Sequence, residues 1–532
     1  MFDKLPSISR TWLIHLVTLF LVVFYNVALF RQFFVAYPVS AVHLVYMLSV
    51  ALVLAASIEL ILHFICFGKS ARFVLIAVLM LSSAASFFMN TYGTVLDASM
   101  LDNIFQTDAR EAGSLINFKL VFYLLFLGVL PSVLVYKIKI DSRSLKVEFL
   151  SSAKIILLAF AVVVLQVMMF SSFYSSFIRK HKEIRVYANP TMYIYSVFDF
   201  VNQYLIPHEN KFVALGEDAA VPATDEKREL VIVVVGETAR AENFSLNGYV
   251  RKTNPLLEKE QVYSFRHFQS CGTSTAISVP CMFSHLDSGN FTVQKGKQEE
   301  NLLDVLHHAG VNVLWRDNNS DSKDVAVRVA YEDFKSNKRN PACDIECRDI
   351  GMLSGLQDYI DSKPEGDMII VLHQMGNHGP DYYNRYPPDF EKFKPACHSD
   401  LLENCSEEQI VNAYDNAILY TDYFLSEVIK LLKTNTEKFE TSMVYVSDHG
   451  ESLGESGVYL HGLPNFMAPN VQRDVGVIFW LGDSVKDVDK SVLPQKTQNK
   501  YSHDQLFHTI LGLFEIKTSV YNPKMDILDH IE

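Results

Sequence analysis

The first 180 residues contain five stretches that are long and apolar enough to cross a membrane as helices. A membrane-spanning helix needs about 20 mostly apolar residues. The first stretch is too long for a signal peptide, and no small-residue cleavage site precedes Arg31, so we expect it to be retained. The second carries Glu59 and His63, which leaves its ends poorly defined. The predicted transmembrane helices cover residues 12–30, 42–67, 73–89, 120–136 and 155–173.

Lysine and arginine are distributed unevenly over the loops between these stretches. They precede the first stretch and lie between the second and third and between the fourth and fifth, whereas the other two loops hold Arg31 alone and an acidic segment. Cytoplasmic loops carry the basic excess. The basic run 179–182 opposes this pattern, but charges before a long translocated domain count for little. We therefore predict a cytoplasmic N-terminus and place the chain after residue 173 across the membrane.

Six of the seven cysteines come after residue 270, in three close pairs. Such cysteines form disulfides in an oxidising compartment, whereas a zinc cluster is the alternative. An oxidising compartment agrees with the topology predicted from the loop charges. We expect each cysteine to pair with its nearest neighbour, as Cys271–Cys281, Cys343–Cys347 and Cys397–Cys405.

Residues 181–228 separate the predicted membrane domain, residues 1–180, from the rest of the chain. Segment 187–205 is rich in aromatic residues but too polar to cross a membrane. It predicts either a helix that lies on the membrane surface or a buried helix of the soluble domain. Residues 207–227 are mixed and charged, as in a linker.

From residue 229 to residue 532, short apolar runs alternate with helical stretches such as 299–308 and 407–433. The apolar runs are rich in valine and isoleucine, which is typical of strands buried on both faces. Alternation of this kind predicts a mostly parallel sheet covered by helices, and so an α/β domain. The predicted strands cover 230–235, 311–315, 368–372, 443–446 and 475–480.

Polar residues follow four of these predicted strands. The carboxyl ends of parallel strands meet at one edge of a sheet, where such folds bind ligands. Glu237, Asp448 and His449 offer two carboxylates and an imidazole, which suit zinc. His378 and His461 could hold a second ion or a substrate phosphate, although a single histidine is more often a surface or core residue.

A second motif, residues 271–276, is a turn of small residues before an apolar stretch that ends at Pro280-Cys281. A turn that leads into a helix directs backbone N–H groups at an anion. A hydroxyl at this place could attack phosphorus if zinc lowers its pKa. The alternative is that Thr273 or Ser274 only caps the helix.

Several motifs in order resemble the phosphoethanolamine transferases that modify lipid A, a family that includes the enzymes of transferable polymyxin resistance. The motifs are GETAR at 236–240, NFSLNGY at 243–249, CGTSTAISVPCMFS at 271–284, WRDNNSDSK at 315–323, HQMGNHGP at 373–380, SDHGESLG at 447–454 and VYLHGLP at 458–464. The resemblance spans the whole chain. It implies five transmembrane helices and a periplasmic catalytic domain with the fold of alkaline phosphatases and sulfatases.

The resemblance also implies roles for individual residues. Thr275, and not Thr273, is the expected nucleophile, and it joins Glu237, Asp448 and His449 around one zinc ion, with a second ion possible. Asn103, Thr107 and Glu111 follow the i, i+4, i+8 spacing of one helix face, which resembles the ethanolamine-binding element of the family. The residues expected around the substrate phosphate are Asn319, Ser320, Lys323, His378 and His461.

The implied reaction moves phosphoethanolamine from phosphatidylethanolamine to a phosphate of lipid A through a covalent threonine intermediate. Lys323 would offset charge on the group in transfer, and His378 or His461 would move protons. The product would carry less negative charge, which gives resistance to polymyxins such as colistin. We expect a monomer in the bacterial inner membrane.

Three alternatives remain. A phosphoglycerol transferase of the lipoteichoic acid synthase type also joins five transmembrane helices to a sulfatase-like domain, but its acceptor is a glycerol polymer. The phosphoethanolamine acceptor could be a core sugar instead of lipid A. A membrane-tethered metal sensor would need no nucleophile. The net charge of −13 gives no reason to expect nucleic acid as a partner.

Overall fold

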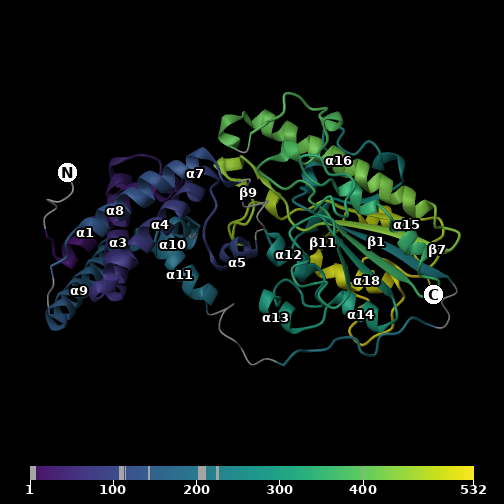
Figure 1. The fold of residues 1–532 in the computed structure, drawn as a ribbon, viewed down its shortest axis with the longest axis horizontal. Coiled ribbons are helices and arrows are strands. Elements are labelled where there is room, and N and C mark those ends of the chain that lie inside the picture. The colour runs from purple at the N-terminus through teal and green to yellow at the C-terminus, as the bar shows by residue number, and fades with distance from the viewer. Residues whose placement is uncertain are drawn as a thin grey trace. The chain divides into compact units, whose positions relative to one another are not determined.

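The structure is a computed structural model that describes residues 7–106, 113, 115–141, 144–181, 183–201, 211–222, 227–399 and 401–531. Contacts divide the chain into two units (Figure 1). The helical unit comprises Met1–Leu101 and Ile116–Leu205, and the soluble unit comprises Asp102–Leu115 and Ile206–Glu532.

The helical unit is built from apolar helices. Four helical segments are long and apolar enough to cross a membrane among the described residues, and a fifth span results if a bent pair counts as one. The helices of the unit are α1 Arg10–Tyr25, α2 Val27–Ala36, α3 Ala41–Ile65, η1 Gly68–Ser70, α4 Ala71–Thr91, α7 Phe118–Tyr123, η2 Leu124–Val129, α8 Leu130–Lys137, α9 Leu145–Met169, α10 Ser171–Lys180, η3 Ile184–Tyr187 and α11 Thr191–Phe200.

The first predicted transmembrane helix is not continuous. α1 and α2 meet at Asn26 with a bend of 53°. The Asn26 side chain is fully buried and donates to the carbonyls of Leu21 (3.0 Å) and Asn189 (2.7 Å), while its oxygen accepts from the Asn189 N–H (2.9 Å). A side chain that bonds to the backbone in this way interrupts the helical ladder. The helix predicted over 12–30 therefore forms as the bent pair α1 and α2, which together are long and apolar enough for one span.

Two other expectations for this unit change. The fifth predicted span, 155–173, is instead α9, which begins at Leu145 and ends at Met169. Within segment 187–205 the chain forms α11, which belongs to the helical unit. The Tyr193 hydroxyl of α11 donates to the Val78 carbonyl of α4 (3.2 Å). A buried helix of the soluble domain is thus excluded, whereas a location at the membrane surface stays a prediction.

The soluble unit contains a seven-stranded sheet in the order β2-β10-β7-β1-β6-β4-β5. β7, β1, β6, β4 and β5 are parallel. β10 runs antiparallel to β7, and β2 runs antiparallel to β10, so β2 has the direction of the parallel strands. The prediction of a mostly parallel sheet is confirmed. The strands are β1 Arg228–Gly236, β2 Tyr263–Phe265, β4 Asn312–Asp317, β5 Ala330–Asp333, β6 Met368–His373, β7 Phe439–Ser447 and β10 Val477–Leu481, with the small pairs β3 His267–Gln269 with β11 Lys500–Ser502 and β8 Ser452–Leu453 with β9 Tyr459–Leu460.

Helices cover both faces of this sheet. α16 packs against β7 on one face, and α14 and α18 lie on the other (Figure 1). The central strand β1 is buried along nearly its whole length because both of its faces are covered, which explains its run of valine and isoleucine. The α-helices of this unit are α12 Thr275–Met282, α13 Val293–Gln298, α14 Leu302–His308, α15 Leu356–Asp361, α16 Glu407–Lys433, α17 Leu493–Lys496 and α18 Leu506–Leu513. The boundary between the units, after Leu101, falls within α5 Ala98–Gln106.

The remaining segments of the soluble unit are fixed by local links. Residues 211–222, which were expected to form a linker, pack on this unit: Leu215 joins its core, and the Val213 N–H donates to the Gln298 carbonyl (2.8 Å). The three predicted disulfides are present, as Cys271–Cys281, Cys343–Cys347 and Cys397–Cys405.

Candidate active site and metal centre

Two carboxylates and an imidazole converge at the carboxyl ends of β1 and β7. Glu237 follows β1, and Asp448 and His449 follow β7. His449 Nε2 lies 3.3 Å from Glu237 Oε1 and 3.3 Å from Asp448 Oδ2. One ligand atom from each residue lies within 4.8 Å of the others, and all three side chains are fully buried. This is a set of donors that suits a metal ion such as zinc.

The local backbone holds this set in place. Gly236 and Ser447 are direct neighbours across the parallel strands, so the residues that follow them start side by side. Asp448 Oδ1 accepts from the N–H groups of Thr238 (3.2 Å) and His449 (2.7 Å). His449 Nδ1 lies 2.9 Å from the Gly450 carbonyl, which makes Nδ1 a donor and leaves Nε2 facing the carboxylates.

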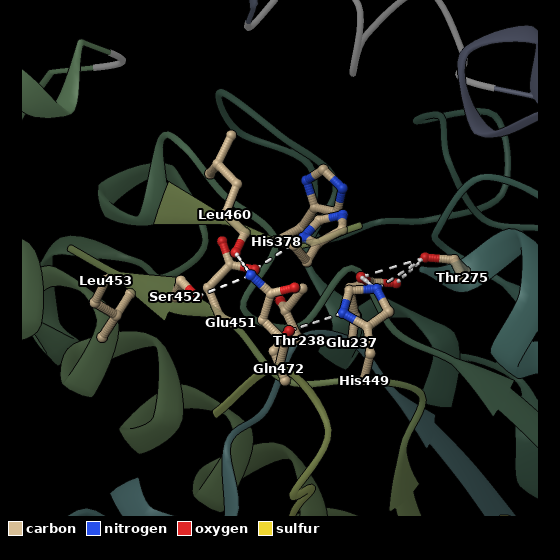
Figure 2. Close-up of polar contacts among 12 residues, drawn as sticks. Glu237, Thr238, Thr275, His378, His449, Glu451, Ser452, Leu453, Leu460 and Gln472 are labelled. Atoms are coloured by element: carbon tan, nitrogen blue, oxygen red, sulfur yellow. Dashed lines mark hydrogen bonds and ion pairs between the residues drawn. The ribbon is translucent and has the colours of Figure 1, made fainter. Parts of the chain in front are cut away.

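The predicted nucleophile lies beside this set. Thr275 is the first residue of α12, and its Oγ1 lies 3.2 Å from Glu237 Oε2 and 3.4 Å from His449 Nε2 (Figure 2). Ser274 makes no capping hydrogen bond, and the Thr273 hydroxyl donates to the Leu463 carbonyl (2.6 Å). The alternative in which these side chains cap the helix is therefore wrong.

Burial and mutual charge shift the pKa values of Asp448, His449 and Glu237. Burial, and then the charge of Glu237, raise the pKa of Asp448 to about 7. Burial alone would lower the pKa of His449, but the Asp448 and Glu237 carboxylates outweigh it and raise that pKa to about 10. Burial likewise opposes ionisation of Glu237, but the hydrogen bond and charge of His449 hold its pKa well below the usual range. Asp448 Oδ2 is buried and accepts no hydrogen bond from the described residues. Two buried carboxylates thus share one imidazole, and a divalent cation would supply the positive charge that balances both of them.

Asn319 supports the first carboxylate directly. Its amide nitrogen donates to Glu237 Oε2 (2.7 Å) and to the Gln374 carbonyl (2.7 Å), while its oxygen accepts from the Ser320 N–H (2.6 Å). The resemblance assigned Asn319 to the substrate phosphate, but here it orients Glu237. Lys323 is nearly buried and lines a cavity of about 10 Å³ together with Asn301.

Both predicted histidines lie close to the metal-binding set. The ring of His461 is 4.2 Å from that of His449, and the ring of His378 is 5.4 Å from that of His461, measured between centroids. Burial, and then His449, lower the pKa of His461, so its imidazole is neutral at neutral pH. His449, Glu451 and His461 form a second group that could hold a metal ion.

Glu451 is a functional candidate that was not predicted from the sequence. Its carboxylate is fully buried and accepts from the Tyr382 hydroxyl (2.6 Å) and from His461 Nδ1 (2.8 Å). The bond to Nδ1 makes His461 Nε2 the acceptor nitrogen. Its place in the motif after β7 was the available signal, but its partner Tyr382 lies far away in the sequence.

The predicted ethanolamine-binding element is described only in part. Asn103 lies on α5, whereas Thr107 and Glu111 lie outside the described residues. The helix face that these three residues were expected to share stays a prediction.

Known proteins are similar in sequence to this chain over nearly its full length. Residues 229–516 match the sulfatase family model, and residues 52–205 match the model of phosphoethanolamine transferases EptA/EptB. The phosphatidylethanolamine transferase Mcr-1 of Escherichia coli is 42% identical over 96% of both chains. EptA of Escherichia coli K12 is 38% identical over 99% of this chain and 97% of its own.

A solved structure agrees over both units. The integral membrane lipooligosaccharide phosphoethanolamine transferase A (EptA) from Neisseria meningitidis has a TM-score of 0.94 at 32% identity, and the match covers 98% of this chain and 99% of that one. The chain therefore belongs to the phosphoethanolamine transferase family, within the alkaline phosphatase and sulfatase superfamily.

Proposed function

We propose that the protein transfers phosphoethanolamine from phosphatidylethanolamine to a phosphate of lipid A, through a covalent intermediate on Thr275. The observation that carries this proposal is the place of the Thr275 hydroxyl, 3.2 to 3.4 Å from Glu237 and His449. A hydroxyl needs a neighbouring group that stabilises its ionised form before it can attack phosphorus.

The resident metal in this proposal is zinc, held by Glu237, Thr275, Asp448 and His449. Asp448 Oδ2, which is buried and accepts no hydrogen bond from the described residues, and the neighbouring carboxylate support a cation at this place. Bound zinc would lower the pKa of the hydroxyl and offset charge on the phosphoryl group. The group His449, Glu451 and His461 supports a second ion. A chelator such as EDTA is expected to inactivate the protein and zinc to restore it, whereas recovery with manganese but not with zinc would contradict the proposal.

The reaction has two halves. In the first, the Thr275 oxygen forms a bond to phosphorus while the bond from phosphorus to the diacylglycerol oxygen breaks, and that oxygen takes up a proton. In the second, an oxygen of the lipid A phosphate bonds to phosphorus, and the Thr275 oxygen leaves and regains a proton. The neutral imidazole of His461, or the side chain of His378, moves these protons.

The helical unit anchors the reaction where both lipids are found. We propose that residues 1–180 cross the bacterial inner membrane with the N-terminus in the cytoplasm, and that residues 229–532 form the periplasmic catalytic domain of a monomer. Asn103, Thr107 and Glu111 would bind the ethanolamine group, and Lys323 would contact the phosphate. The added ammonium group lowers the negative charge of the outer surface, which gives resistance to polymyxins.

Relatives with different printed names differ in their similarity to this chain. The Kdo(2)-lipid A phosphoethanolamine 7''-transferase of Escherichia coli is only 25% identical to this chain, against 42% for Mcr-1. The relatives are named as phosphatidylethanolamine or phosphoethanolamine transferases, which supports phosphoethanolamine as the transferred group.

The test is mass spectrometry of lipid A from cells with and without the protein. We expect lipid A that carries additional phosphoethanolamine only where the protein is made. Unmodified lipid A together with a modified core sugar or glycerol polymer would overturn the proposal.

A further inference from the structure

One arginine, Arg385, bonds to the backbone of the loop that carries His378. Arg385 Nε donates to the His378 carbonyl (2.6 Å), and the same guanidinium forms ion pairs with Asp381 and Glu346. Its side chain is only 4% exposed. A guanidinium can direct several donors to fixed positions at once, which a lysine cannot do. Arg385 thus fixes the backbone of His378 relative to two carboxylates.

Space around His378 is too tight for this backbone to relax. A Cβ atom added at the next residue, Gly379, would lie 2.7 Å from the Tyr382 hydroxyl and 2.8 Å from Glu451 Oε1. Tyr382 and Glu451 also orient His461 through the Glu451–His461 bond. The segment that follows His378 therefore contacts the supports of both histidines.

Glu346 reaches Arg385 from the tight loop that the Cys343–Cys347 disulfide closes. Within this loop the Asp344 N–H donates to the Glu346 carbonyl (3.0 Å), and the Glu346 N–H donates to Asp344 Oδ1 (3.2 Å). The Glu346 side chain is 9% exposed, whereas the adjacent Ile345 is 80% exposed. The loop therefore turns one carboxylate inward and presents its apolar residue to the outside.

A second link joins the same two segments. The Arg348 guanidinium, next to the disulfide loop, donates to the Asn384 carbonyl and is paired with Asp344. The segment 381–385 is thus tied to the disulfide loop at two positions, by Glu346 to Arg385 and by Arg348 to Asn384. Because buried, charge-assisted bonds are costly to leave unpaired, these links resist displacement of the segment.

We propose that Arg385, held by Glu346 of the disulfide-closed loop, positions His378 for the transfer of phosphoethanolamine. This inference rests on the proposed function and deepens it. Neither Arg385 nor Glu346 contacts Glu237, Asp448 or His449 through any bond described above, so both are positioning residues for the histidine and not for the metal-binding set. Loss of the link should impair the use of substrate without loss of metal.

The experiment is a double-mutant cycle on the full-length protein in detergent, with zinc, phosphatidylethanolamine and lipid A. The variants are Glu346→Gln, His378→Asn and their combination, with Ile345→Ala as the matched control from the same loop. Modified lipid A is measured by mass spectrometry, zinc content by elemental analysis, and folding by the thermal midpoint. Arg385→Lys, which keeps the charge, replaces Glu346→Gln if that variant lowers the thermal midpoint more than the control does.

We expect Glu346→Gln to reduce transfer about tenfold with unchanged zinc content, because a small displacement of a reacting group is costly. In the His378→Asn background the same change should cost less than about twofold, because residues that act as one unit are not additive. Ile345→Ala should transfer as the wild type does.

A tenfold loss in both backgrounds would show a general structural role and overturn the inference. So would full activity of Glu346→Gln and Arg385→Lys. A wild-type protein that leaves lipid A unmodified would instead contradict the proposed function itself.

Discussion

Arg10 in the helical unit and Glu237 in the soluble unit are both buried charged residues, but they have opposite surroundings. The Arg10 guanidinium lies 3.2 Å from Glu148 Oε2 and also donates to the Cys66 carbonyl (2.9 Å) and the Ser152 hydroxyl (2.6 Å). The buried charge of Arg10 is therefore paired with an opposite charge and with acceptors.

Glu237, by contrast, shares a fully buried site with a second carboxylate, Asp448, and with a single imidazole, His449. Carboxylates that are this close to one another destabilise the fold unless a cation joins them. In the helical unit, the oppositely charged pair Arg10 and Glu148 holds helices together. At the strand ends, the two neighbouring carboxylates mark the candidate active site. Each prediction below tests this contrast.

The largest effect should come from Thr275→Ala. Transfer to lipid A should fall by about a thousandfold or more, because the variant lacks the hydroxyl that attacks phosphorus in the proposed reaction. The thermal midpoint should not fall, since this residue serves the reaction and not the fold. Mass spectrometry of lipid A and a thermal unfolding curve measure the two quantities, and substantial residual transfer would place the nucleophile elsewhere.

Replacing Arg10 should lower stability but leave the metal-binding site unchanged. Arg10→Met leaves Glu148 without its partner and should cost about 3 kcal/mol of stability, as is typical when one member of a buried pair is removed. Unfolding of the full-length protein in detergent measures the cost, and Trp12→Leu, at an exposed position of α1, is the control. Zinc content should be the same in both variants, and a loss of zinc from Arg10→Met would break the contrast between the units.

Zinc affinity should rise with pH. The pKa of Asp448 is raised to about 7 and that of His449 to about 10, so both hold a proton below pH 7 that zinc must displace. The association constant should therefore rise about tenfold or more per pH unit below pH 7. Titration calorimetry in buffers with different ionisation enthalpies measures the released protons, and an affinity independent of pH would contradict the assignment.

The raised pKa of Asp448 also makes the stability of the metal-free protein depend on pH. A carboxyl group whose pKa is raised by folding binds its proton more tightly in the folded state, so its contribution to stability is lost as pH rises. For Asp448 this loss should extend from about pH 4, its ordinary pKa, to about pH 7. Denaturant unfolding of the metal-free protein across this range tests the sign.

Asn319→Ala should have the smallest effect. It removes the amide that donates to Glu237 Oε2, and supports of this kind typically change metal affinity by about tenfold. Titration of the metal-free variant with zinc measures this change. If Asn319 serves only the substrate phosphate, as the family resemblance implied, zinc affinity will not change and only transfer will fall.

The parts of the fold that could be predicted from the sequence are those that depend on local pattern. β1, β4, β6 and β7 were found because each is a short run of apolar residues buried on both faces. α16 was predicted with its observed bounds, because Ser406 and Gln409 form a capping box at its start and an amphipathic pattern runs to Lys433. The convergence of Glu237 and Asp448 followed from strand direction alone.

The features that were missed depend on partners far away in the chain. The bend at Asn26 is stabilised by Asn189, 163 residues later, and no local pattern shows that pairing. Glu451 acquires its place from Tyr382, 69 residues earlier. Asn319 lies in a motif that indicated its chemistry, but only the folded chain shows that its amide faces Glu237.

The three disulfides follow one another along the chain without crossing, and each joins cysteines separated by only 10, 4 or 8 positions. A chain that is synthesised from its N-terminus exposes both sulfurs of one pair before the first sulfur of the next pair appears. Correct oxidation can thus proceed in step with synthesis, and a simple oxidant suffices without an isomerase to reshuffle wrongly joined partners.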